Sequence, residues 1–223
     1  MADLTDEQQQ IIDRTADFVR NQMKGDSSGH DWWHVWRVWQ NSLVISRNEK
    51  ANRFVTELAA LLHDIADWKF HDGDESAGPK AARAWLSEQS LGESVIEHVC
   101  DIVATVSFKG AGVETPMATL EGKIVQDADR LEAIGAIGIA RCFAFGGAKG
   151  RLMHDPEDPP ELHASFDDYK NKSGPSINHF YEKLLLLKDR MNTKTGLKIA
   201  AQRHKVLEDF LVQFHAEWNI TST

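Results

Sequence analysis

The sequence is poor in the residues that mark several classes of protein. It has two cysteines, Cys100 and Cys142, which form neither a CxxC pair nor another metal-ligand spacing, so we expect reduced core thiols rather than a disulfide scaffold or a thiolate zinc site. Basic residues are fewer than acidic ones, 25 against 34, and the formal charge is -9. This balance disfavours a surface for nucleic-acid polymers, because such a surface must neutralise several phosphates. A small phosphorylated substrate stays compatible if a metal ion and a few local cations receive it.

Long hydrophobic runs are also missing. The N-terminal "MADLTDEQQQ" has neither the basic start nor the apolar run of a signal peptide, and the most apolar later stretch, "AIGAIGIARCFAF", is short and interrupted by Arg141. We therefore expect a cytoplasmic protein that does not associate with a membrane.

Alternating apolar and polar residues, the pattern of half-buried strands, do not occur over lengths that would build a sheet. Apolar residues at helical spacing fill most of the 223 positions instead, which predicts an all-α fold in one domain. The expected helices cover residues 5–23, 31–47, 52–65, 75–88, 93–106, 116–145, 176–191 and 197–218. Thr5 with Gln8 forms a capping-box pattern, Asp31 and Asn52 are expected N-caps, and Pro116 suits a first helical position.

Between positions 146 and 175 the helical pattern stops. This stretch, "GGAKGRLMHDPEDPPELHASFDDYKNKSGP", holds most of the six prolines in the chain. A connection of this length is uncommon in a compact domain unless it is functional or disordered. We predict a long loop at about 146–175.

Four polar residues interrupt apolar helix faces. His34 shares a face with Val38 and Ile45, and His63 with Asp64 ends the apolar stripe of the third expected helix. Asp129 lies in "VQDADRLEAIGA", in a helix whose apolar side is marked by Leu131, Ile134 and Ile137.

Buried polar groups of this kind need a common partner, because a charge stranded in a core costs several kcal/mol or shifts its pKa. Two imidazoles and two carboxylates suit a borderline divalent ion such as Mn²⁺, Fe²⁺, Co²⁺, Ni²⁺ or Zn²⁺. Four ligands also leave positions open for water and substrate, as catalysis requires. His98, which stands alone at its position, is a weaker candidate for a second metal ion.

Three motifs occur in order along the chain: "HxxRV" at 34–38, "HD" at 63–64 and "DADR" at 127–130. Together they resemble the signature of HD-domain metal-dependent phosphohydrolases. The resemblance implies that His34, His63, Asp64 and Asp129 bind the metal. Asp127 would then cap or steady a ligand, although the two aspartates of "DADR" could exchange these roles.

The resemblance extends to "HDIADWKFHDGDE", "DADRLEAIGAIGIAR" and "HFYEKLLLLKDRMNTKTG", and so covers about residues 26–218. Over this length the chain is similar to single-domain bacterial HD hydrolases that release pyrophosphate from nucleoside triphosphates. It implies one HD-type domain over 1–223, with an N-terminal helix at 5–23, a core at about 26–145 and C-terminal helices at about 176–218. It also implies one divalent metal ion, with Mn²⁺ expected and Mg²⁺, Fe²⁺, Co²⁺, Ni²⁺ or Zn²⁺ as alternatives.

Proton transfer and substrate contacts call for further residues. Asp67 lies one helical turn after His63, at a position where some HD nucleotidases hold a catalytic glutamate; it could equally be a helix-end or salt-bridging aspartate. The candidate substrate contacts are five cations, each of which could instead be a solvated surface residue, and a histidine, His30, that could instead simply end the loop. The cations are Arg37, Lys149, Arg151, Lys183 and Lys188.

The sequence leaves three functions open. The first is a metal-dependent hydrolysis of (d)NTPs to the monophosphate and pyrophosphate. The second is a phosphomonoesterase or phosphodiesterase that acts on another small phosphorylated substrate. The third is a module that binds metal and nucleotide without turnover. In each case the partner is a small nucleotide or phosphorylated molecule, and the chain is expected to be a monomer or homodimer.

Overall fold

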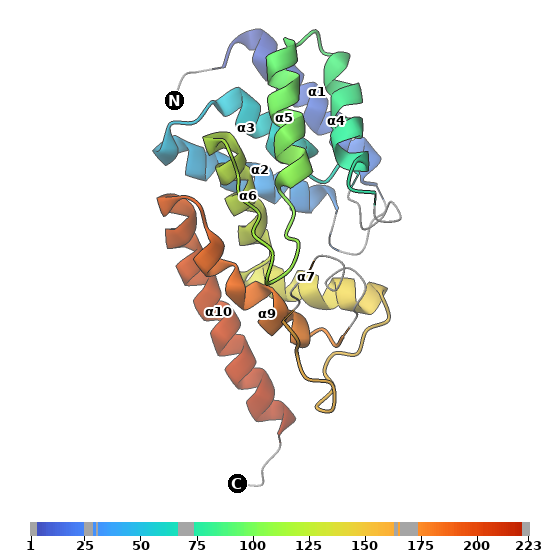
Figure 1. The fold of residues 1–223 in the computed structure, drawn as a ribbon, viewed down its shortest axis with the longest axis vertical. Coiled ribbons are helices and arrows are strands. Elements are labelled where there is room, and N and C mark those ends of the chain that lie inside the picture. Colours follow the sequence, from blue (N-terminus) through green and yellow to red (C-terminus); the bar gives the residue numbers. More distant parts are fainter. Residues whose placement is uncertain are drawn as a thin grey trace. The chain divides into compact units, whose positions relative to one another are not determined.

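The computed structural model describes residues 4–24, 29, 31–66, 74–162, 165 and 174–219. Its contacts divide the chain into two compact units. The first unit holds Met1–Lys109 with Glu114–Asp129, and the second holds Gly110–Val113 with Arg130–Thr223. Every regular element among the described residues is a helix, which confirms the all-α prediction (Figure 1). One domain over 1–223 stays a prediction, and each unit is described below by itself.

The first unit is built from the N-terminal helices. They are α1 (Asp6–Gln22), α2 (Trp32–Glu49), α3 (Arg53–Leu62), α4 (Ala77–Ser87), α5 (Glu93–Thr105) and most of α6 (Leu120–Glu132). The second unit contains α7 (Gly135–Ala148), α9 (Asn178–Glu182), α10 (Lys194–Trp218) and the short 3₁₀ turns η2 (Leu184–Leu186) and η3 (Lys188–Arg190). The predicted positions of the first five helices are confirmed to within a few residues.

The expected N-caps are present. Thr5 and Gln8 form a reciprocal capping box at α1, with Gln8 N 3.2 Å from Thr5 Oγ1 and Thr5 N 3.1 Å from Gln8 Oε1. Asp31 Oδ1 accepts from His34 N at 2.9 Å at the start of α2. Asn52 Oδ1 accepts from Phe54 N at 3.1 Å and from Val55 N at 3.4 Å at the start of α3. These side chains satisfy backbone donors that a helix leaves open in its first turn.

Helix α3 is the centre of the first unit. All of its residues from Phe54 to Leu62 are buried, and it packs against α1, α2 and α5. Trp39 Nε1 on α2 donates to the buried Glu57 Oε2 on α3 at 2.7 Å, and Glu57 also pairs with Arg53. This contact fixes α2 against α3. The helix that carries His34 and the helix that ends just before His63 are therefore held together.

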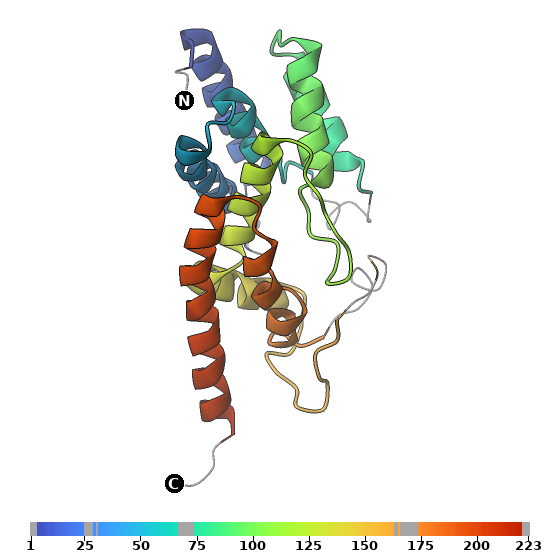
Figure 2. The same cartoon turned by 60° about the vertical axis from the view of Figure 1, so that its left-hand side comes forward.

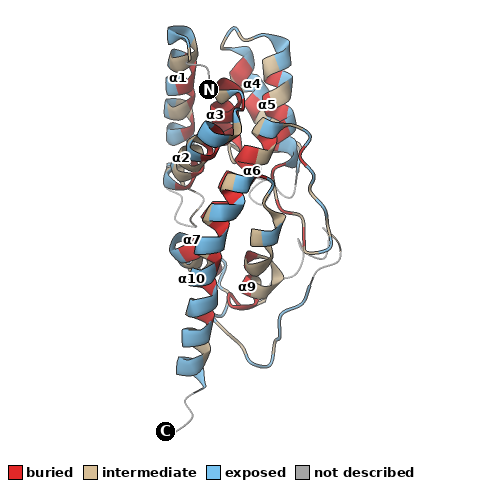
Figure 3. Cartoon of the chain, turned by 90° about the vertical axis from the view of Figure 1, so that its left-hand side faces the viewer, coloured by how far each residue is buried: buried red, intermediate tan, exposed pale blue. Residues whose placement is uncertain are grey.

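The outer helices of the first unit shield α3. Helix α1 carries its buried residues along one side and exposed residues along the other (Figure 3). Helices α4 and α5 pack side by side as an antiparallel pair in both views of the ribbon (Figures 1 and 2). Because the two helices run in opposite directions, the start of α4 lies beside the end of α5. Gly78 of α4 and Val103 of α5 are therefore neighbours.

The predicted long helix at 116–145 is wrong. Helix α6 begins at Leu120, where Thr119 Oγ1 accepts from Gly122 N at 3.2 Å, and it ends at Glu132. Gly135, the first residue of α7, has a φ of 77°, a left-handed value that glycine adopts readily because it has no Cβ.

A second glycine explains why the chain turns so closely there. A Cβ on Gly138 would lie 2.3 Å from the Ala133 carbonyl, so only glycine fits in the first turn of α7. Ile137 was predicted on the apolar side of one continuous helix. Because α7 is a separate helix, its residues do not continue the faces of α6, and Ile137 is exposed. Among the described residues no single helix has the length and apolar character to cross a membrane; the bent pair of α6 and α7 passes that test only when taken together.

The predicted helix at 176–191 is also broken, into α9, η2 and η3. Arg130 Nη1 donates to the carbonyl of Arg190, and the Arg190 guanidinium donates to the carbonyls of Gly110, Ala111 and Val113. These hydrogen bonds hold η3 against the 110–113 segment of the same unit.

The long loop follows α7 as predicted, with no helix in its described part from Lys149 on. Backbone hydrogen bonds tie its two sides together: Ser176 N donates to Leu152 O at 2.9 Å, and Ile177 N donates to Met153 O at 3.0 Å. Asn178 Nδ2 also donates to Asp158 O at 2.7 Å.

Both cysteines are free thiols, as expected. Burial raises the pKa of Cys142 to about 12, and its thiol donates to the Ser176 carbonyl at 3.4 Å. Burial also raises the pKa of Cys100. Both therefore stay protonated at neutral pH and have the character of core residues rather than nucleophiles.

The cap at Asn52 should contribute measurably to stability, because it satisfies two backbone donors of the central helix. Asn52→Ala should lower the free energy of unfolding by about 1 kcal/mol, measured as a lower urea midpoint at an unchanged slope. Asn48→Ala, on the exposed side of α2, is the matched control. An equal effect of both variants would contradict the cap.

Candidate metal centre

His34 lies in the first turn of α2 and points into the first unit. Its side chain is 1% exposed, and Val38 and Ile45 on the same face are fully buried. The Asp31 cap bonds directly to the backbone N–H of His34. The local sequence thus fixes both the start of the helix and the face on which this imidazole lies.

His63 immediately follows the last residue of α3, and its ring has a defined orientation. Nδ1 lies 2.8 Å from the carbonyl oxygen of Ala60. Because a carbonyl only accepts hydrogen bonds, Nδ1 carries the hydrogen, and the neutral ring presents the lone pair of Nε2 on its other side. That nitrogen points toward His34.

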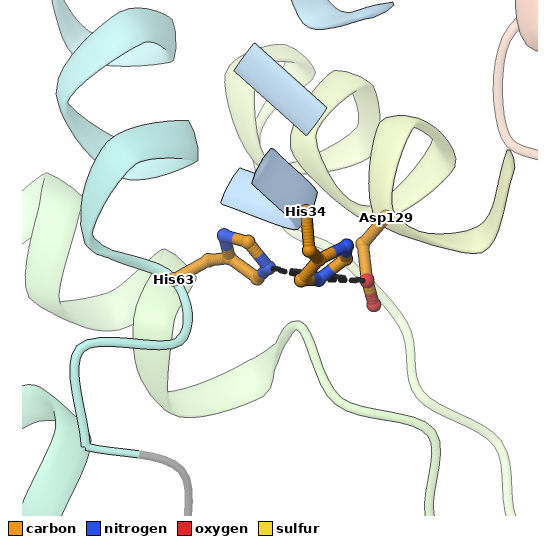
Figure 4. Close-up of side chains that lie close together, drawn as sticks. All are labelled: His34, His63 and Asp129. Atoms are coloured by element: carbon orange, nitrogen blue, oxygen red, sulfur yellow. Dashed lines mark hydrogen bonds and ion pairs between the residues drawn. The ribbon is translucent and has the colours of Figure 1, made fainter. Parts of the chain in front are cut away.

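Four donor atoms converge from three segments of the first unit. The Nε2 atoms of His34 and His63 are 3.2 Å apart. Asp64 Oδ2 lies 3.2 Å from the first and 3.5 Å from the second, and Asp129 Oδ1 lies 3.6 Å and 3.9 Å from them. Figure 4 shows His34, His63 and Asp129 pointing toward one another, and their ligand atoms all lie within 4.8 Å of each other. Asp64 lies beside both imidazoles but is not part of this group of three.

This donor set fits a divalent cation. Two donors that are each about 2.1 Å from one ion lie about 3.0 Å apart at a right angle and about 4.2 Å apart when opposite. The separations that involve the two imidazole nitrogens lie between 3.2 and 3.9 Å. Lone pairs from two nitrogens and two carboxylates repel one another unless a proton or a cation lies among them. The hydrogen bond at Nδ1 of His63 is also the outer contact that metal-bound histidines usually have.

Of the two aspartates in "DADR", the geometry favours Asp129. Its side chain is 31% exposed and its carboxylate reaches both imidazoles. Asp127 is fully buried two residues earlier in α6 and is not part of this group. A helical separation of two residues turns side chains by about 200°, so both cannot face the same ion.

The remaining predicted residues stay predictions. Asp67 and His30 lie outside the described residues. Arg37 is half-buried on α2. In the second unit, Lys149 and Arg151 lie over the ring of Phe145, at 5.8 and 5.5 Å from its centre.

The last two predicted cations also lie in the second unit. Lys183 follows α9 and is half-buried, and Lys188 Nζ is 3.7 Å from its neighbour Asp189.

His98 is engaged away from the four converging residues. Its Nε2 shares a hydrogen bond of 3.0 Å with Thr119 Oγ1 and lies 3.7 Å from Glu121 Oε2. Glu121 Oε1 in turn accepts from Asn52 N at 2.7 Å. These contacts tie the start of α6 to α5 and α3, and the part of His98 in a second metal site stays a prediction.

The sequence reasoning missed a cleft beside the HD pair. It is a small cleft, with a volume of about 20 Å³, and is lined by His63, Asp64, Ala66, Glu75, Gly78, Pro79, Val103, Ala104 and Ser107. Glu75 also forms an ion pair with Lys109. The stretches "GDES" and "SFKG" carry no recognisable motif, and only the antiparallel packing of α4 and α5 brings them together.

Comparisons with known proteins agree with this geometry. The family model of the HD domain matches residues 32–134. The chain is 37% identical to the uncharacterized protein YpgQ of Bacillus subtilis (strain 168) over 209 residues, 90% of either chain.

Three crystal structures are similar along nearly the whole chain. A protein from Lactobacillus plantarum has a TM-score of 0.86 and is 34% identical, covering 98% of this chain and 100% of its own. An HD-superfamily hydrolase from Bacillus thuringiensis has a TM-score of 0.72 and is 46% identical, covering 96% and 100%. Bacillus subtilis YpgQ in complex with ADP has a TM-score of 0.71 and is 34% identical, covering 92% and 98%.

Removing one carboxylate should abolish metal binding without unfolding the chain. At a Mn²⁺ concentration one hundred times its Kd, a site present only in the folded state adds about 2.7 kcal/mol of stability. We expect Mn²⁺ to raise the melting temperature of the unaltered chain and to leave that of Asp64→Ala unchanged. Asp101→Ala, at an exposed position of α5, should respond like the unaltered chain. Full Mn²⁺ stabilisation of Asp64→Ala would contradict the ligand assignment.

Proposed function

The chain belongs to the HD domain family, and we propose that it is a metal-dependent phosphohydrolase that acts on nucleotides. One observation supports this proposal: ligand atoms of His34, His63 and Asp129 lie within 4.8 Å of one another, and Asp64 Oδ2 lies 3.2 and 3.5 Å from the two imidazole Nε2 atoms. The HD domain match at 32–134 includes all four residues.

His34, His63, Asp64 and Asp129 would hold the metal. Mixed nitrogen and oxygen donors favour Mn²⁺ and its neighbours over Ca²⁺ or a thiolate-bound Zn²⁺. Such an ion, when bound, polarises a phosphoryl oxygen and makes water a stronger nucleophile. The Ala60 carbonyl keeps His63 in the tautomer that offers Nε2 to the ion, and burial keeps bulk water from both imidazoles.

The other residues would handle protons and substrate charge. Asp67, one turn beyond His63, is the candidate for proton transfer with the attacking water or the leaving group. Arg37 and His30 are candidate contacts from the first unit, and Lys149, Arg151, Lys183 and Lys188 from the second. Such cations would stabilise the negative charge that develops on the transferring phosphoryl group.

The substrate that we propose is a nucleoside triphosphate. YpgQ, to which the chain is 37% identical over 90% of its length, has been crystallised in complex with ADP, a nucleotide with a phosphate chain. In the proposed reaction the oxygen of water bonds to the α-phosphorus, and the bond from that phosphorus to the bridging oxygen breaks. The products are a nucleoside monophosphate and pyrophosphate, and the proton lost by water is taken up by a carboxylate or by the solvent.

Product analysis tests this proposal directly. The full chain, loaded with Mn²⁺, is incubated with ribo- and deoxyribonucleoside triphosphates, and pyrophosphate and orthophosphate are measured separately. We expect equal amounts of monophosphate and pyrophosphate, and no turnover by Asp64→Ala. Release of orthophosphate would instead identify a phosphomonoesterase, and nucleotide binding without any product would identify a binding module.

A further inference from the structure

The described residues that line the cleft beside the HD pair all belong to the first unit, and they include the carboxylates of Asp64 and Glu75. His63 and Asp64 form one end of it. Its walls come from the first turn of α4, with Gly78 and Pro79, and from the last turn of α5, with Val103 and Ala104. Glu75 and Ser107 line the region where these helix ends meet.

Small residues keep this cleft open. A Cβ on Gly78 would lie 3.3 Å from Val103 Cγ1 and 3.4 Å from the Ala66 carbonyl oxygen, so a side chain there would fill part of the space between α4 and α5. Ala66 and Ala104 have only a methyl group each. These small residues leave the cleft open directly beside two of the four converging residues.

The described residues that line the cleft include two carboxylates and a hydroxyl but no lysine or arginine. A neighbouring cation in the described part of the chain is Lys109, two residues after Ser107, whose Nζ pairs with Glu75 Oε1. The Lys109 side chain is 27% exposed and that of Glu75 is 44% exposed. An ion pair this exposed contributes little to stability, so a ligand with more negative charge could replace Glu75 as the partner of Lys109.

We propose that Lys109 and Ser107 form a subsite for the pyrophosphate portion of the substrate, next to the metal centre. This inference rests on the proposed function and adds to it residues that bind the leaving group. Lys109 Nζ would leave Glu75 and pair with phosphate oxygens, while the Ser107 hydroxyl donates a hydrogen bond to them. Glu75 lowers the affinity of the subsite for anions, because its negative charge repels the anion and competes for the ammonium group of Lys109.

A purely structural role for Lys109 makes different predictions. If the Lys109–Glu75 pair only joins α4 to the segment after α5, loss of either partner should lower the melting temperature and leave anion binding unchanged. If Lys109 binds the anion, Lys109→Ala and Glu75→Gln should change the affinity for pyrophosphate in opposite directions.

The experiment measures binding rather than turnover. Inorganic pyrophosphate and AMP are titrated separately into the full chain with Mn²⁺ by isothermal calorimetry, for the unaltered protein, Lys109→Ala, Lys109→Arg and Glu75→Gln. Lys80→Ala, an exposed lysine of α4 outside the cleft lining, controls for the loss of one positive charge. Circular dichroism of each variant reports whether it folds.

We expect Lys109→Ala to weaken pyrophosphate binding by about tenfold, the loss of one charge-assisted contact, with AMP affinity changed less than twofold. Lys109→Arg should restore most of the affinity, and Glu75→Gln should increase it. Unchanged pyrophosphate affinity in folded Lys109→Ala, or an equal loss in Lys80→Ala, would overturn the subsite. Turnover of triphosphates by the unaltered protein is measured alongside, so a failure of the subsite is distinguished from a failure of the proposed function.

Discussion

The close approach of His34 Nε2 and His63 Nε2, 3.2 Å apart and flanked by the carboxylates of Asp64 and Asp129, is the constraint on which the first unit depends. Two nearly inaccessible imidazoles and two acids cannot share so small a space without a compensating charge. A divalent cation bound among them would resolve this conflict, and under the proposed function it would also supply the chemistry. The groups that are most costly to bury are thus those to which we assign the function.

The surrounding helices hold these groups in place from outside. Asp31 caps α2 at the backbone of His34, Ala60 orients the ring of His63, and Trp39 joins α2 to α3 through Glu57. Glu121 connects the start of α6 to Asn52 at the start of α3, and Asp129 lies farther along the same helix. Each donor therefore projects from a rigid helical segment or its end, which favours a preformed site over one assembled by the ligand.

Much of this arrangement was predictable from the sequence because it depends on local rules. The caps at Thr5, Asp31 and Asn52 and the apolar stripe ending at His63 are encoded within a few residues of one another. The break between α6 and α7 was missed because apolar periodicity continues across it; it depends on the close approach of Gly138 to Ala133, which is visible only in three dimensions. The pairing of Glu75 with Lys109 was missed for a similar reason, since the packing of α4 on α5 creates it.

A crystal structure of the chain grown with Mn²⁺, with anomalous diffraction collected at the manganese edge, tests the metal centre most directly. We expect one anomalous peak in the first unit, within bonding distance of Nε2 of both His34 and His63 and of carboxylate oxygens of Asp64 and Asp129. The same crystals of Asp64→Ala should lack it. No peak at this position, at a Mn²⁺ concentration that supports turnover, would contradict the assignment.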